Sequence, residues 1–225
     1  PPPEQRVIKF LLNPPEKTTF CAIAVSPDGR RVAFTAPDAS GKRQLWVRLL
    51  DALSAQPLAG AEGASFPFWS PDSAWIGFFA EEKLKKMEAS GGPAQTLCRA
   101  PNGRGGAWSG DGVIVFAPNQ YAPLHQVSAA GGEPRPVTEM DASHQETSHR
   151  WPQFFPGGRR FLYFNWSGQP EHQGIYLGSL DGKEKRRLLA AEASAAYAGS
   201  GSGPGYLLFV RERALMAQQL DPGTL

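Results

Sequence analysis

The chain has 225 residues, of which 41% are hydrophobic, so it can bury a sizeable core in one all-β domain or two small ones. Its 23 basic and 21 acidic residues give a formal net charge of +2, too balanced to indicate a nucleic-acid or membrane-surface partner. Gly (25) and Pro (21) are abundant, while thirteen Phe, six Trp and five Tyr argue against disorder. We therefore expect a folded domain with many tight turns.

The N-terminal segment separates from the rest by composition. Residues 1–5 are polar and Pro-rich and are interpreted as the end of a linker. Residues 6–12 form an isolated strand candidate, which Asn13-Pro14-Pro15 terminates. The sequence has no initiator Met, so we expect it to be part of a longer protein, and the lack of a visible signal peptide then carries little information.

A turn signature recurs along the remaining chain. In Ser26-Pro27-Asp28-Gly29, Pro presets φ, Asp can cap its own backbone, and Gly accepts a left-handed conformation. A period near forty residues, with strands around each turn, is typical of repeat architectures. The related turns are Ser70-Pro71-Asp72-Ser73, Ser109-Gly110-Asp111-Gly112 and Phe155-Pro156-Gly157-Gly158.

Each turn is expected to join two apolar strands, which two more polar strands follow. The strand after the turn is apolar in every unit, at residues 32–34, 76–78, 114–116, 161–163 and 207–209. Third strands are predicted at 44–50, 83–89, 124–129, 174–180 and 214–220. Short fourth strands are predicted at 56–59, 95–98, 135–138 and 186–189. Only 83–89 also has a helical pattern, so the helical alternative is disfavoured there.

These elements predict an all-β fold, a β-propeller of four-stranded antiparallel blades, because no unit can bury its aromatic face alone. The propeller domain is placed at 6–225. The fifth unit ends after three strands, so strand 6–12 is expected to supply the fourth and close the ring; alternatively, further units follow residue 225. The blade units are approximately 18–60, 61–100, 101–140, 145–191 and 194–225.

Two cysteines, Cys21 and Cys98, are too few for a disulfide scaffold. Both lie in apolar, strand-like runs. We therefore expect two buried free thiols.

The repeated turn and apolar triplet resemble the repeats of TolB and other WD-repeat-like propellers. A closer resemblance is to the propeller that follows the membrane span in many bacterial serine/threonine protein kinases. It rests on the stretches GAEGASFPFWS (60–70), SHRWPQF (148–154), GIYLGSLD (174–181) and GYLLFVRE (205–212).

This resemblance implies a non-enzymatic binding or sensor scaffold in the periplasm or outside the cell. The kinase and the membrane tether would lie in segments absent from this chain. The partner would be a protein or a small-molecule ligand, with no cofactor. Two alternatives stay open: a periplasmic TolB-like protein-interaction scaffold, and the accessory propeller of a prolyl-oligopeptidase-type serine peptidase.

Catalytic and metal motifs do not fit. The Gly/Ser run 199–203 is out of register with the Gly-x-Ser-x-Gly elbow of hydrolases. His144 and His149 are five residues apart, whereas metalloprotease helices need two His four apart. The carboxylates of Asp28, Asp72 and Asp111 are more simply turn caps than metal ligands. We expect neither a metal site nor catalysis.

One constellation could bind a ligand. The start of each first strand is expected near the mouth of the central channel, where Arg104 and Arg150 occupy equivalent positions of units three and four. His149 adjoins them, and Tyr197 is the corresponding residue of unit five. Two guanidinium groups there could bind a carboxylate or a phosphate bidentately. The simpler alternative is that both arginines satisfy carbonyl groups of neighbouring loops.

Overall fold

The computed structural model describes residues 11–14, 18–38, 40–199 and 204–225. These residues form five antiparallel sheets in chain order and two 3-10 helices, η1 (Ala142–His144) and η2 (Pro222–Thr224). No helix among them is long and apolar enough to cross a membrane. The prediction of an all-β propeller is confirmed.

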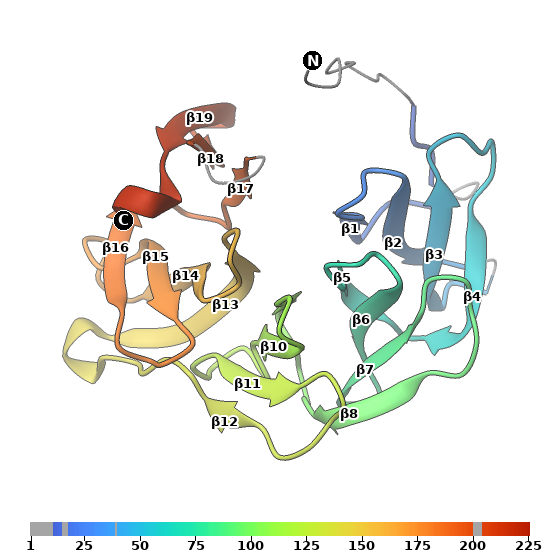
Figure 1. Cartoon of the computed structure of the whole chain (residues 1–225), viewed down its shortest axis with the longest axis horizontal. Coiled ribbons are helices and arrows are strands. Elements are labelled where there is room, and N and C mark those ends of the chain that lie inside the picture. Colours follow the sequence, from blue (N-terminus) through green and yellow to red (C-terminus); the bar gives the residue numbers. More distant parts are fainter. Residues whose placement is uncertain (1–10, 15–17, 39, 200–203) are drawn as a thin grey trace.

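Each sheet is a meander whose strands run outward from the centre (Figure 1). The innermost strands are β1 (Ala22–Val25), β5 (Ser65–Trp69), β9 (Gly106–Trp108), β13 (Glu146–Phe154) and β17 (Ala196–Ala198). The second strands are β2 (Arg31–Pro37), β6 (Trp75–Ala80), β10 (Val113–Phe116), β14 (Arg160–Ser167) and β18 (Gly205–Arg211). The third strands are β3 (Arg43–Leu49), β7 (Lys83–Glu88), β11 (His125–Ser128), β15 (Gly174–Ser179) and β19 (Ala214–Leu220). The fourth strands of blades 1 to 4 are β4 (Gln56–Glu62), β8 (Gln95–Arg99), β12 (Arg135–Pro136) and β16 (Lys185–Leu189).

The first two inner turns form as their sequence predicts. Asp72 accepts hydrogen bonds from Ser70 Oγ at 2.5 Å and from the Ala74 N–H at 3.0 Å, and Asp28 does the same in blade 1. The third turn is one residue shorter, since the Ser109 N–H donates to the carbonyl four residues on instead of five. Its Asp111 accepts no such bond within the described part of the chain, so the turn-cap prediction holds only at the first two positions.

The hydrophobic core consists of layers between consecutive sheets. Inner-strand contacts link β1 to β5, β5 to β9 and β9 to β13. Within the described ranges, each pair of neighbouring blades shares one cluster of buried apolar side chains. Representative members, from the first interface to the last, are Met87 and Phe78, Leu84 and Phe116, Val115 and Phe161, and Phe164 and Phe209.

The blades follow an arc, and the first and last sheets lie at its two ends (Figure 1). Equivalent strand pairs show the consequence. In blade 2, the opposed residues Phe79 and Leu84 are almost fully buried against blade 3. Their counterparts in blade 5, Val210 and Leu215, are 51% and 74% exposed. Within the part of the chain that the structure describes, no other blade therefore covers this face of blade 5.

The closing strand expected at 6–12 is described only in part. Residues 6–10 lie outside the described residues, and Leu11 and Leu12 are not in a strand. The carbonyl of Leu11 accepts a hydrogen bond from Arg48 Nη1 at 3.0 Å, and Leu12 packs on the apolar face of blade 1. This end of the described chain thus lies against the first sheet.

The two cysteines are free, but only one is buried. Cys98 lies in the core between blades 2 and 3, and burial raises the pKa of its thiol to about 11. Cys21 is exposed, which corrects the expectation of two buried thiols. It directly precedes β1, the innermost strand of the sheet at one end of the arc, and among the described residues no blade comes before this sheet.

Candidate functional site

The inner strands of blades 2, 3 and 4 share a backbone feature near their starts. Four residues before each turn begins, Phe66, Gly105 and Trp151 have left-handed φ angles of 47°, 93° and 51°. Glycine adopts this conformation without strain, whereas Phe and Trp do not. In β5 and β13 the residue lies within a shift of strand register, so each is a bulge that redirects the adjacent side chains.

Arg104 and Arg150 directly precede the left-handed residues of blades 3 and 4, and the structure brings the two arginines together. The N–H of Trp151 donates to the carbonyl of Arg104 at 3.0 Å, which joins the two strand starts directly. Arg104 Nη2 donates to Gln120 Oε1 at 3.1 Å, and Arg150 Nη2 donates to the Gln120 carbonyl at 3.2 Å. Arg150 Nε also donates to Ser148 Oγ at 2.7 Å. Both guanidinium groups therefore meet at Gln120, in the loop between β10 and β11.

Aromatic rings surround this arginine pair, Arg104 and Arg150. The Arg104 guanidinium lies 5.8 Å from the centre of the Phe66 ring, and that of Arg150 lies 5.1 Å from the Trp166 ring. The Trp151 ring is 5.9 Å from Arg150. Such cation–π contacts hold the guanidinium groups in place without neutralising their charge.

The arginine pair has no carboxylate partner within the residues that the structure describes; the ion pairs found there all involve other side chains. Partial burial, and next the positive charge of Arg104, lower the pKa of Arg150 below its usual value. Two like charges side by side with no counter-ion form a site that attracts an anion. Both arginines also donate hydrogen bonds to Gln120, and Arg150 does so to its backbone carbonyl. The alternative from the sequence, that the arginines bind carbonyl groups of neighbouring loops, therefore describes part of the geometry.

His149 does not join the pair. Its side chain is fully buried and turns toward blade 3, where Nδ1 lies 2.8 Å from Thr138 Oγ1. Nε2 is 3.4 Å from Glu146 Oε2, and Glu146 is buried as well. Burial lowers the pKa of His149 and outweighs the opposite effect of Glu146.

Glu146 is the centre of a polar network that links blades 3 and 4. Burial alone would raise its pKa, but the nearby His149 ring and hydrogen bonds from Lys185 and the Asp141 N–H lower it to about 2. Asn165 Nδ2 also donates to Glu146 Oε1 at 2.9 Å. These donors come from β13, β14, β16 and the segment after β12.

Thr138, His149 and Glu146 have the order of a nucleophile, base and acid. The Thr138 hydroxyl, however, already accepts the Leu124 N–H at 2.9 Å, and His149 is inaccessible. The arrangement fits a buried connection between blades better than a reaction centre.

Tyr197 lies at the other end of the inner strands. Its backbone N–H and carbonyl pair with the side-chain amide of Gln153, and its ring packs on Phe155 at 5.0 Å. Tyr197 lines a cavity of about 700 Å³ to which all five blades contribute, Trp69 and Trp108 among them. The structure thus brings Arg104 and Arg150 together and places His149 and Tyr197 elsewhere.

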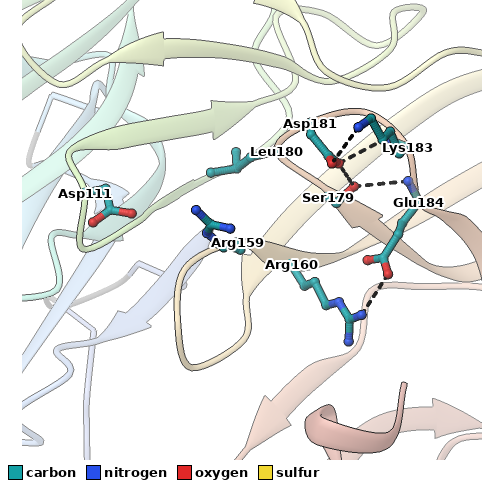
Figure 2. Close-up of a pocket in the computed structure, with 8 residues that line it drawn as sticks. All are labelled: Asp111, Arg159, Arg160, Ser179, Leu180, Asp181, Lys183 and Glu184. Carbon is teal, nitrogen blue, oxygen red and sulfur yellow. Dashed lines mark hydrogen bonds and ion pairs between the residues drawn. The ribbon is translucent and has the colours of Figure 1, made fainter.

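A second cavity, of about 630 Å³, lies between the third turn and blade 4 (Figure 2). Its charges largely pair with one another: Arg160 Nη2 is 2.9 Å from Glu184 Oε1, and Lys183 Nζ is 3.9 Å from Asp181 Oδ2. The lining holds three basic and three acidic side chains, so it selects neither anions nor cations. Across the described ranges, no three His, Cys, Asp or Glu side chains are grouped to hold a metal ion.

Among the side chains around the arginine pair that sequence reasoning missed are Phe66, Gln120 and Trp166. Phe66 had a detectable signal, because it aligns with Gly105 and Trp151 in the repeat and a Gly at one of three equivalent positions suggests a positive φ. Gln120 and Trp166 lie on segments whose approach depends on how the blades pack.

No protein-family model matches this chain, and no curated protein matches it. Solved structures do resemble it. A putative TolB from Agrobacterium tumefaciens superposes with a TM-score of 0.67 at 15% identity, over 91% of this chain and 77% of that chain. The chain has a TolB-like propeller fold.

Two further structures agree. TolB from Acinetobacter baumannii gives a TM-score of 0.62 at 11% identity, over 87% of this chain but only 52% of that chain. The β-propeller domain of the Trilobed protease from Pyrococcus furiosus gives 0.59 at 18% identity, over 90% of this chain and 67% of that one. This chain thus spans about half the length of Acinetobacter TolB, and the low identities establish the fold alone.

Proposed function

We propose that this chain is a non-enzymatic binding scaffold, the extracytoplasmic propeller of a bacterial receptor-type serine/threonine kinase. The observation that carries the proposal is the cavity of about 700 Å³ to which every blade contributes. A rigid stack of sheets that lines a cavity holds loops and strand ends in fixed positions for a ligand. The kinase and the membrane tether belong to segments outside this chain.

A second candidate is a periplasmic TolB-like scaffold for protein interactions, which the two TolB structures favour. The propeller domain of the Trilobed protease gives weaker support to a third, the accessory propeller of a serine peptidase. The reading frame that contains this chain separates the three. A kinase domain and membrane span before it support the first candidate, a signal peptide alone the second, and a hydrolase domain after it the third.

Location outside the cytoplasmic membrane is tested with the cysteines. Cys21 is exposed and Cys98 is buried with a raised thiol pKa, so a maleimide should label Cys21 alone in the folded protein. In cells that express the full reading frame, with the outer membrane permeabilised, a membrane-impermeant maleimide is expected to label the wild type but not Cys21→Ser. Labelling that requires lysis of the cytoplasmic membrane would refute the proposed location.

A further inference from the structure

We propose that the arginine pair, Arg104 and Arg150, recognises a carboxylate on an apolar or aromatic body, such as the C-terminus or an acidic side chain of a partner polypeptide. This assignment rests on the proposed binding function and names the chemistry that one rim of the propeller selects. The site uses strand starts of blades 3 and 4, so it forms only when these two blades are packed together.

The two neighbouring positive charges of the pair favour the binding of an anion. Arg104 lies close enough to lower the pKa of Arg150, and within the described residues neither side chain has a carboxylate within 4 Å. Trp151 donates its N–H to the Arg104 carbonyl, so the two strand starts cannot separate to relieve the repulsion without breaking this bond. A bound anion would relieve it.

The available donors favour a carboxylate over a phosphate. A guanidinium group has five N–H donors, and the bonds to Gln120 and Ser148 leave part of each fork unused. Phosphate sites usually add free backbone N–H groups from a nest or a helix N-terminus. Here the N–H groups of Arg104, His149 and Trp151 all donate to backbone carbonyls. Two guanidinium groups without additional free backbone N–H donors are complementary to the two oxygens of a carboxylate.

The surroundings specify the rest of the ligand. Trp166 and Tyr121 are exposed, at 42% and 70%, although both are large side chains beside the pair. Phe66 and Trp151 adopt left-handed backbone conformations, which are strained for aromatic residues, and each contacts one arginine of the pair. Aromatic surface of this kind binds an apolar or aromatic group next to the carboxylate.

Isothermal titration calorimetry on the whole chain tests the assignment with four probes: N-acetylphenylalanine, its C-terminal amide, N-acetylaspartate amide and inorganic phosphate. We expect the acid to bind at least about tenfold more tightly than its amide, because the neutral amide cannot accept the charge-assisted hydrogen bonds that the carboxylate accepts. The aspartate derivative tells a side-chain carboxylate from a C-terminal one. Equal affinity for the acid and its amide, or tighter binding of phosphate, would overturn the proposal.

Variants locate the site. Arg104→Gln and Arg150→Gln should each weaken binding of N-acetylphenylalanine about tenfold, and Arg104→Lys, which keeps the charge but not the fork, should fall between. Arg99→Gln removes the same charge from an exposed position at the end of strand β8 and should bind like the wild type. If either Gln variant has a lowered Tm, the affinity of the Lys variant and the comparison of acid with amide in the wild type decide whether the assignment holds. Unchanged affinity in the pair variants would refute this site, while the maleimide experiment would still judge the proposed location.

Discussion

Glu146 is a buried charge that several donors satisfy at once. Lys185 Nζ is 2.7 Å from its Oε2, and the Asp141 N–H donates to the same oxygen, also at 2.7 Å. Because these donors belong to different segments, the carboxylate fixes the start of β13 relative to the end of blade 3. Arg150 lies on the same strand, four residues further along, so its position depends on this network.

Replacing Glu146 by Gln is expected to lower the free energy of unfolding at pH 7 by on the order of 3 kcal/mol. The reason is linkage: a carboxyl whose pKa is about 2 when folded and 4.5 otherwise stabilises the fold above pH 4.5 and loses this contribution as the pH falls toward 2. Urea unfolding at pH 7, 5 and 3 measures both effects. Glu171→Gln, in the exposed loop before β15, is the control and should behave like the wild type.

His149 adds to acid sensitivity in a different pH range. Its folded-state pKa is lowered, so the unfolded chain takes up a proton more readily as the pH falls below about 6.5. Stability from the neutral imidazole is complete above that pH and declines below it. The Glu146→Gln variant should therefore keep a loss of stability between pH 6.5 and 5 and show a smaller one below 4.5. An unchanged profile below pH 4.5 would contradict the role assigned to Glu146.

At the scale of the element, the turns give a matched comparison. Asp72 accepts hydrogen bonds from Ser70 and Ala74, whereas Asp111 makes no comparable bond among the described residues. Asp72→Ala should lower stability by about 1 kcal/mol, or about 2–4 °C in Tm for a chain of this size. Asp111→Ala should remain within about 0.5 kcal/mol of the wild type. Equal effects in thermal melts would mean that the carboxylate of Asp72 does not stabilise its turn.

The elements themselves were predictable from sequence because each turn carries its own chemistry. Ser26-Pro27-Asp28-Gly29 and its relatives mark the hairpins, and the apolar triplets mark the second strands. The strand predicted at 83–89 is β7, which spans Lys83–Glu88. Side-chain directions inside β13 were less accessible. Register shifts interrupt its alternation, so neighbouring His149 and Arg150 could not be assigned to a side from the pattern alone.

At the scale of the whole molecule, the repeat predicted that the blades stack but not which residues of the first and last blades are exposed. Burial of Cys21 was expected from its apolar neighbours in the sequence. Its exposure depends, however, on whether another blade packs against its strand. Tyr197 was aligned with the strand starts of the other blades, and the structure places it next to the central cavity instead. Both outcomes depend on packing between blades.

The uncovered face of blade 5 makes a prediction about equivalent residues. Leu84 and Leu215 occupy the same place in β7 and β19, but Leu84 is fully buried and Leu215 is 74% exposed. Leu84→Glu should lower the free energy of unfolding by about 3–5 kcal/mol, because it buries an unpaired charge. Leu215→Glu should change it by less than about 0.5 kcal/mol. Comparable losses in chemical denaturation would indicate that the face of blade 5 is covered in solution.

The most direct test of the binding account is side-chain NMR of the arginines during a titration with N-acetylphenylalanine. If two packed blades hold the arginine pair ready for a carboxylate, the Nε–Hε signals of Arg104 and Arg150 should shift together and saturate with one dissociation constant, while that of Arg99 stays in place. Unmoved signals from the pair, or equal shifts across all arginines, would contradict the account.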